Sequence, residues 1–214
     1  MKRVFFVDFD GTITLKDTCV AMTEAFAGDS WQELDAMWQK KEISTQECAT
    51  RTFQLFNADL ADLRKVLDNI RIDSCFGQFI DYCRDNSYPV YILSDGYDFN
   101  IEHIMTKHGY QLPYYANHLV YDEGFQIHCT YHNDACGQCG TCKKSLLESL
   151  TPLGYQTVYI GDGLSDTCPA AVCDLVFAKG SLLRYCRSHQ IAAVPMEGFR
   201  DVLEKMVPNK NTYE

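Results

Sequence analysis

The sequence predicts an α/β fold, with a parallel sheet flanked by helices and a helical cap subdomain inserted near the N-terminus. Short apolar runs of strand length recur at residues 3–8, 88–93, 156–160 and 175–178. Such nearly continuous apolar runs are typical of strands buried on both faces of a parallel sheet. Helical patterns separate them, and each of the first three ends in a polar cluster, where α/β folds place ligand chemistry.

A long helical block separates the first two predicted strands. Its apolar spacing and capping residues predict helices at residues 17–26, 31–40, 45–56 and 58–70. A crossover between parallel strands needs only about a dozen residues, so this block is longer than a simple connection. We therefore predict a helical cap at residues 15–74, inserted into a core formed by residues 1–14 and 75–214.

The rest of the chain continues the α/β pattern. Two short runs at residues 118–120 and 125–129 flank a Tyr-Asp-Glu-Gly turn and predict a β-hairpin. Further helices are predicted at residues 99–108, from residue 143 onward, at residues 182–189 and at residues 199–206.

Composition limits the classes of partner. The 214 residues suit one core with an appended subdomain, and 46% hydrophobic with 22% charged residues is ordinary for a globular protein. A formal net charge of −10 argues against nucleic acid, which requires a basic surface. The apolar stretch at residues 4–7 is too short for a signal peptide, and no long apolar run indicates a membrane span. We expect a cytoplasmic protein, monomeric or homodimeric, with a small-molecule partner.

The first polar cluster, DFDGT, follows the first strand. In extended backbone, alternation brings Asp8, Asp10 and Thr12 to one side. One carboxylate there can attack phosphorus, while its neighbour protonates the leaving oxygen and later deprotonates water. Gly11 lets backbone amides approach a phosphoryl oxygen. Alone, the pentapeptide also fits an ordinary loop of capping residues.

Two further clusters follow later strands. Ser94, Asp95 and Gly96 offer a hydroxyl and amides for phosphate at the start of a helix, or simply a turn. The GDGLSD segment places Asp162 and Asp166 on one turn, a donor set that suits Mg²⁺. Asp162 is expected to bind the ion directly. Asp166 can bind it directly, bind it through water, or steady a lysine.

A lysine that begins a helix completes the set, because it can spread the charge of crowded carboxylates and phosphate. Lys143 and Lys144 both compete for this role. The three clusters with this lysine resemble the four motifs of the haloacid dehalogenase superfamily, met here by DFDGT, Ser94, Lys143 and GDGLSD. The favoured lysine is Lys143, which fits the family spacing.

The resemblance implies a Rossmann-like core and a magnesium-dependent phosphatase. It implies that Asp8 is the nucleophile, and that Asp10 is the general acid and base and binds the metal through its backbone carbonyl. Thr12 and Ser94 are then phosphate ligands, and Mg²⁺ lies between Asp8, the Asp10 carbonyl and Asp162. An aspartate two positions after the nucleophile is typical of phosphatases and phosphomutases rather than dehalogenases.

A finer resemblance concerns the substrate. The helical insert is similar to that of the phosphoserine phosphatase branch, and DFDGTIT with CGQCGTCK resembles the methionine-salvage phosphatases, which act on 2-hydroxy-3-keto-5-methylthiopentenyl-1-phosphate. The phosphoethanolamine and phosphocholine phosphatases are related. By this resemblance, Asp17 and Arg51 lie where the branch contacts substrate. Arg51 equally fits an ion pair with Glu47, four residues earlier on a helix.

The cysteines pose a separate question. An odd count of 11 without an export signal indicates reduced thiols. Structural zinc takes four thiolate or imidazole ligands, and the candidates are Cys136, Cys139 and Cys142 with Cys129, His128 or His132. Such a site would fix the loop that presents Lys143. Free thiols or a disulfide are the alternatives.

The clusters together predict a phosphatase that uses two in-line displacements on a small phosphate ester. A phosphomutase, which returns the phosphoryl group to another substrate hydroxyl, is the alternative within catalysis. A zinc-binding interaction module with a vestigial active site is the alternative of another class, but it requires a broken motif, and every expected polar residue is present.

Overall fold

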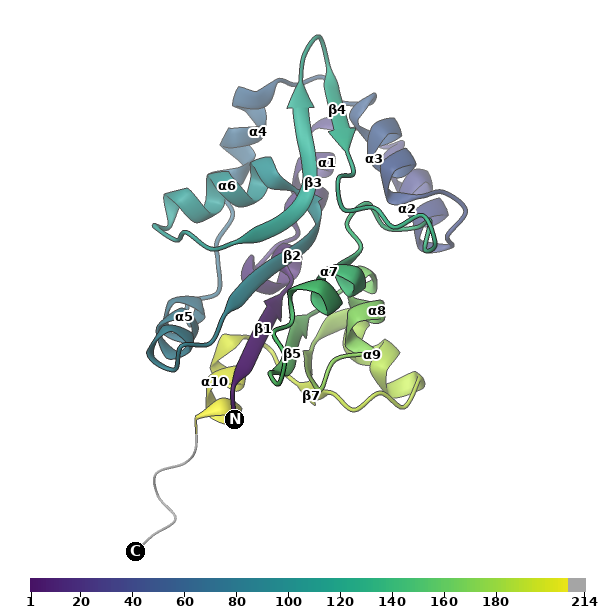
Figure 1. Cartoon of the computed structure of the whole chain (residues 1–214). Coiled ribbons are helices and arrows are strands. Elements are labelled where there is room, and N and C mark those ends of the chain that lie inside the picture. Colours follow the sequence, from purple (N-terminus) through teal and green to yellow (C-terminus); the bar gives the residue numbers. More distant parts are fainter. Residues whose placement is uncertain (208–214) are drawn as a thin grey trace, which may run out of the picture.

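A seven-stranded sheet forms the centre of the computed structural model, which describes residues 1–207 (Figure 1). The strand order is β4-β3-β2-β1-β5-β6-β7, and every neighbouring pair is parallel except β3 with β4. The strands are β1 (Arg3–Val7), β2 (Val90–Tyr97), β3 (Tyr114–Tyr121), β4 (Phe125–His128), β5 (Gln156–Gly161), β6 (Leu175–Ala178) and β7 (Val194–Pro195). The mostly parallel sheet confirms the predicted fold class.

Helices cover both faces of this sheet and its carboxyl end (Figure 1). They are α1 (Thr18–Phe26), α2 (Trp31–Gln39), α3 (Thr45–Phe53), α4 (Leu60–Leu67), α5 (Phe76–Asp85), α6 (Asp98–Lys107), α7 (Lys143–Leu150), α8 (Thr167–Ala170), α9 (Gly180–Ser188) and α10 (Phe199–Met206). Two short helical segments, η1 (Phe9–Ile13) and η2 (Leu164–Asp166), follow β1 and β5. None of the helices within residues 1–207 has the length and apolar composition of a membrane span.

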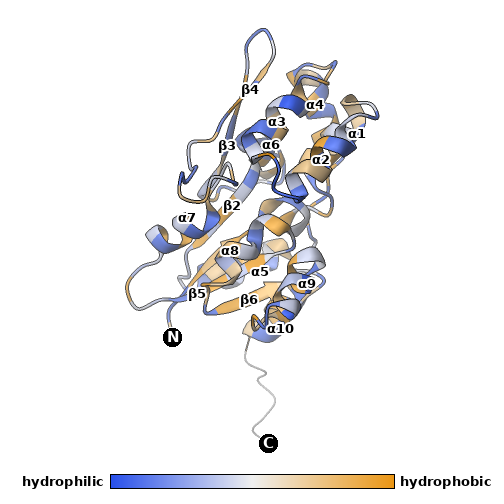
Figure 2. Cartoon of the chain, turned by 90° about the vertical axis from the view of Figure 1, so that its right-hand side faces the viewer, coloured by the Kyte–Doolittle hydropathy of each residue, from blue (hydrophilic) through white to orange (hydrophobic). Residues whose placement is uncertain are grey.

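Strand β1 is buried on both faces, as its unbroken apolar sequence predicts. Phe5 lies in a core with Phe79 of α5 and Phe199 of α10, and Phe6 lies in a second core with Leu147 of α7. Alternate residues of the strand therefore pack against helices on opposite sides of the sheet. Figure 2 shows the apolar colouring along β5 and β6, between the helices that flank them.

Helices α1 to α4 lie beyond the carboxyl ends of the parallel strands, beside the β3–β4 hairpin (Figure 1). The chain segments that enter and leave this block pair with each other. The Leu15 amide donates to the Arg71 carbonyl at 2.8 Å, and the Asp73 amide donates to the Ile13 carbonyl at 2.9 Å. These two hydrogen bonds hold the entering and leaving segments side by side. Phe53 of α3 stacks on Phe125 of β4 with ring centroids 4.8 Å apart, which joins the cap helices to the hairpin.

Helices α5 and α8 and strand β7 lie outside the sequence expectations. Helix α5 was not predicted, and its N-cap residue Cys75 makes no side-chain capping hydrogen bond, so the usual start signal is missing. Strand β7 has only two residues, too few for a recognisable pattern.

We predict that Phe79→Ala lowers the free energy of unfolding by about 3–5 kcal/mol, because it leaves a cavity in the core. Phe79 is fully buried and packs edge-on against Phe5 with ring centroids 5.2 Å apart. Urea denaturation measures the change. Leu153→Ala is the control, since Leu153 is fully exposed and its loss should change stability by less than about 0.5 kcal/mol. Equal effects of both substitutions would contradict the assignment of this core.

Candidate active site

The segment after β1 turns sharply and brings its polar side chains together. Asp8 directly follows β1 with extended backbone, and Gly11 adopts a φ of 76°. A Cβ atom at Gly11 would lie 2.6 Å from Oδ2 of Asp162, so both the backbone conformation and the close approach require glycine. The Gly11 amide donates to Thr14 Oγ1 at 3.0 Å, so this amide is already engaged.

Lys143 lies at the centre of the cluster, buried at the start of α7. Its Nζ donates to Asp8 Oδ1 at 2.5 Å, to Asp166 Oδ1 at 2.7 Å and to Ser165 Oγ at 3.1 Å. Burial lowers its pKa, but the two carboxylates outweigh burial and raise the pKa of Lys143 above its ordinary value. Lys144 instead lies at the surface near Glu148.

Asp166 is the anchor of this lysine. Its Oδ1 accepts from Lys143 and from the Tyr159 hydroxyl at 2.6 Å. Its Oδ2 accepts from the amides of Asp162 at 3.0 Å and Gly163 at 2.9 Å. Four hydrogen bonds occupy this fully buried carboxylate. Of the three roles considered for Asp166, this arrangement favours steadying Lys143 over direct metal binding.

A group of carboxylates fits a divalent ion. Oxygens of Asp8, Asp162 and Asp166 lie within 4.8 Å of one another. Burial, with the charge of Asp166, raises the pKa of Asp162 to about 6 and that of Asp8 well above its ordinary value. Thr12 Oγ1 donates to Asp162 Oδ1 at 3.1 Å, which orients this carboxylate. Hard oxygen donors at this spacing suit Mg²⁺.

Asp10 faces the same centre from its own network. Oδ1 accepts from the amide of Thr18 at 2.9 Å and from its hydroxyl at 2.5 Å, and Oδ2 accepts from Ser94 Oγ at 3.3 Å. Burial, followed by the nearby charge of Asp17, raises the pKa of Asp10 to about 6. A carboxyl group with this pKa can both donate and accept a proton near neutral pH.

The Ser94-Asp95-Gly96 cluster belongs to strand β2, which runs on to Tyr97, and does not begin a helix as expected. The Gly96 amide donates to Ser94 Oγ at 2.9 Å. The Asp95 carboxylate accepts hydrogen bonds from Thr45 and from the Thr141 amide at the cavity wall.

A cavity of about 410 Å³ opens over these groups. Asp8, Asp10, Asp162 and Ser94 line its floor, with Asp17 beside them. Residues of the helical block line one side: Cys19, Val20, Thr23, Trp31, Asp35, Trp38, Gln39, Thr45, Cys48, Ala49 and Thr52. The remaining lining residues belong to the core: Asp95, Gly96, Tyr97, Gly163, Leu164, Ser165 and Ser181.

Arg51 is not among the lining residues, contrary to the substrate role considered for it. Its guanidinium lies 3.4 Å from Glu47 on the exposed face of α3. The i,i+4 ion pair is therefore the reading that the structure supports.

The expected zinc site is not supported. Among the described residues, Cys129, Cys136, Cys139 and Cys142 do not form a group with ligand atoms within 4.8 Å, with or without a histidine. All eleven cysteines are free thiols, so no disulfide forms either. His132 Nδ1 is engaged with the Cys139 carbonyl at 2.9 Å.

Several site residues were not identified from the sequence. Thr18 holds Asp10 and begins helix α1, directly after its cap Asp17. The position directly after a capping residue is the sequence feature that could have identified Thr18. Tyr159 reads as one more apolar strand residue, and only the fold shows its hydroxyl beside Asp166.

Comparison with known proteins identifies relatives along most of the chain. The family model described as Putative Phosphatase matches residues 3–181. Proteins named 2-hydroxy-3-keto-5-methylthiopentenyl-1-phosphate phosphatase, from Bacillus velezensis and Bacillus cereus, are each 31% identical to this chain. The alignments cover 91% of this chain and 86% of the first relative, and 92% of this chain and 92% of the second.

Solved structures share the fold. A phospho-aspartyl intermediate analogue of phosphoserine phosphatase has a TM-score of 0.73 at 19% identity, covering 96% of this chain and 99% of that one. A HAD family hydrolase from Salmonella enterica serovar Typhi has a TM-score of 0.76 at 16% identity, covering 97% and 71%. These similarities confirm the expected core architecture.

We predict that Lys143→Met lowers the free energy of unfolding by about 3–5 kcal/mol in the presence of a chelator, because it leaves buried carboxylates without their cation. Urea denaturation measures the change. Lys144→Met removes a neighbouring surface lysine and should change stability by less than about 0.5 kcal/mol. A Lys143→Met protein as stable as the Lys144→Met control would contradict this account of the cluster.

Proposed function

The chain belongs to the Putative Phosphatase family within the haloacid dehalogenase superfamily, and we propose that it hydrolyses a small phosphate monoester with Mg²⁺ through an aspartyl-phosphate on Asp8. The observation that carries the proposal is the position of Asp8, which shares one cluster with Asp162 and Lys143 at the floor of a cavity. The Asp10 carboxyl group lines the same cavity. A nucleophile, an acid, a metal site and a cation are thus supplied together.

In the first displacement, a carboxylate oxygen of Asp8 forms a bond to phosphorus, and the bond from phosphorus to the ester oxygen breaks. Asp10 gives its proton to that departing oxygen. Thr18 and Ser94 hold the Asp10 carboxyl group in place for this transfer. The ammonium of Lys143 neutralises Asp8 and stabilises negative charge on the phosphoryl oxygens.

In the second displacement, Asp10 takes a proton from water, whose oxygen forms a bond to phosphorus. The bond between phosphorus and Asp8 breaks, which releases inorganic phosphate and restores the carboxylate. Asp10 ends the cycle protonated, as it began. Bound Mg²⁺ would neutralise phosphoryl charge, and Asp8 and Asp162 with the Asp10 carbonyl are the groups proposed to hold it.

The residues that line the cavity limit which leaving group of a phosphate ester can bind there. Trp31, Trp38 and Tyr97 supply aromatic surface, and no lysine, arginine or histidine of the described residues lines the cavity. The carboxylate of phosphoserine would lack a cationic partner there. A methylthio tail suits an aromatic wall, because thioether sulfur contacts rings favourably. We therefore propose a methylthiopentenyl phosphate of methionine salvage as the substrate, as the names of the relatives suggest.

A second candidate rests on the acidic residues of the same wall. Asp17 and Asp35 line the cavity beside the aromatic rings. Carboxylates and aromatic faces together attract quaternary and primary ammonium groups. Phosphoethanolamine and phosphocholine are therefore the alternative substrates, and phosphoserine is disfavoured.

We predict that Asp8→Asn lowers phosphate release by about 10⁴-fold or more, the scale seen when a covalent nucleophile is removed. The assay measures inorganic phosphate released from methylthiopentenyl, ethanolamine, choline and serine phosphates. Asp81→Asn is the control, since Asp81 lies exposed on α5 beside Arg84. Full activity of Asp8→Asn would contradict the mechanism, and a rearranged ester without free phosphate would indicate a phosphomutase.

We predict that Mg²⁺ stabilises the metal-stripped protein, by about 2.7 kcal/mol when the ion is at 100 times its dissociation constant. Thermal unfolding against Mg²⁺ concentration measures the gain. Asp162→Asn should abolish it, because that side chain is a proposed ligand. Asp122→Asn, in the exposed hairpin turn, should keep it. Equal stabilisation of both variants would place the ion elsewhere.

A further inference from the structure

Asp95 makes contacts that the proposed reaction does not use. Its Oδ1 accepts from the Thr141 amide at 2.8 Å, and its Oδ2 accepts from Thr45 Oγ1 at 2.8 Å. Asn117 Nδ2 donates to the Asp95 carbonyl at 2.7 Å and lies 3.4 Å from Oδ1. One carboxylate therefore joins the cysteine-rich loop (residues 136–142) to the first residue of helix α3.

The cysteine-rich loop is held firmly on the core side. Thr141 is fully buried, and its hydroxyl donates to Asn117 Oδ1 at 3.3 Å. Gly140 lies so close to Asn117 that an added Cβ would come within 2.9 Å of Nδ2. Only Cys142 separates Thr141 from Lys143, so the Asp95 contact fixes the backbone immediately before the buried ammonium.

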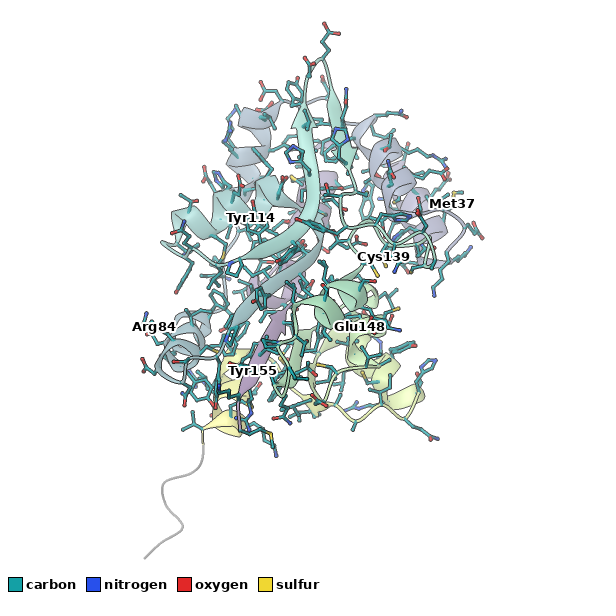
Figure 3. The ribbon with its side chains drawn as sticks, viewed as in Figure 1. Met37, Arg84, Tyr114, Cys139, Glu148 and Tyr155 are labelled. Atoms are coloured by element: carbon teal, nitrogen blue, oxygen red, sulfur yellow. The ribbon has the colours of Figure 1, made fainter. Side chains whose placement is uncertain are left out.

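The same loop also holds the cap helices. The Gln138 carbonyl accepts from the Thr45 amide at 2.9 Å, and Gln138 Nε2 donates to the Ile43 carbonyl at 3.0 Å. Thr45 Oγ1 in turn accepts from Trp38 Nε1 at 3.0 Å, and Trp38 lines the cavity. Figure 3 shows Cys139 of this loop between α2 and α3 on one side and α7 on the other.

We propose that Asp95 is a positioning residue that fixes Lys143 and Trp38 at once, through the Thr141 amide and the Thr45 hydroxyl. The inference rests on the proposed phosphatase activity, because Lys143 serves the phosphoryl group and Trp38 the leaving group. In the cysteine-rich loop, these contacts to the cap and to the core are made by Gln138, Gly140 and Thr141, which lie between the cysteines, and not by the thiols.

A direct role of the Asp95 charge in substrate binding is the competing explanation, since Asp95 also lines the cavity. The substitution Asp95→Asn distinguishes the positioning role from a direct role of the charge. The asparagine amide oxygen can accept from the Thr141 amide, and its amide nitrogen can donate to Thr45 Oγ1, so the geometry survives while the charge is lost. Alanine removes both contacts.

The first test compares Asp95→Ala with Asp95→Asn. Asp95→Ala should lower kcat/KM by about 10- to 100-fold, as expected for lost hydrogen bonds to a charged group, and Asp95→Asn should stay within about threefold of wild type. Loss of activity in Asp95→Asn equal to that in Asp95→Ala would overturn the proposal, because charge would then be required. Wild-type activity in Asp95→Ala would overturn it as well.

The second test isolates the cap side and needs no change at Asp95. Thr45→Val should raise KM about fivefold for the methylthiopentenyl substrate and leave kcat within about twofold, since Lys143 keeps its support. Thr50→Val, on the exposed face of the same helix, is the matched control. Unchanged KM in Thr45→Val would overturn the proposal, even if Asp95→Ala failed to fold.

A spectroscopic readout is independent of turnover. The chain has 2 tryptophans, so its ¹H–¹⁵N spectrum contains two indole N–H peaks, which Trp31→Phe assigns. The Trp38 peak should shift in Thr45→Val and Asp95→Ala but stay near its position in Asp95→Asn. An unmoved Trp38 peak in Thr45→Val contradicts the inference. An active Asp8→Asn enzyme would instead refute the proposed function. The peak shifts would still test whether Asp95 and Thr45 position Trp38.

Discussion

The buried ammonium of Lys143 is the interaction on which the site depends. It donates to Asp8 and to Asp166, two carboxylates that follow the neighbouring strands β1 and β5. The ammonium compensates the buried carboxylates, because desolvation penalises an unpaired buried charge heavily. Since Asp8 directly follows β1, Asp166 ends η2 and Lys143 begins α7, a single charge fixes the mutual placement of three distant segments.

The parallel sheet makes that convergence possible. Strand β1 lies between β2 and β5, so the residues that follow these strands meet at one end of the sheet. The chain leaves β1 for β2 on one side and later returns to β5 on the other, which creates a topological switch point beside Asp8. A cavity forms there because the helical block covers the same end (Figure 1). The fold thus determines where chemistry can occur before any particular side chain is considered.

Much of the fold and of the site could be predicted from short-range sequence patterns. The features that depend on contacts between distant residues could not be predicted in this way. The buried strands and the acidic clusters at Asp8 and Asp162 are readable because strand burial and Gly-Asp turns leave short-range patterns. Arg51 could not be assigned that way, since an i,i+4 ion pair and a substrate contact look alike in sequence. The cysteine spacing left a zinc site, a disulfide and free thiols open, because spacing does not determine whether thiols point toward one another.

The charge of the centre supplies the physical reason for a divalent ion. Asp8, Asp10, Asp162 and Asp166 gather around one lysine, and burial raises the pKa of the first three carboxyl groups. A phosphate ester brings further negative charge into the same cavity. Lys143 already neutralises the carboxylates that position it, so it cannot by itself balance the substrate as well. A phosphoryl group can approach Asp8 only with additional positive charge, and the carboxylate oxygens that make the centre acidic are the hard donors that Mg²⁺ prefers.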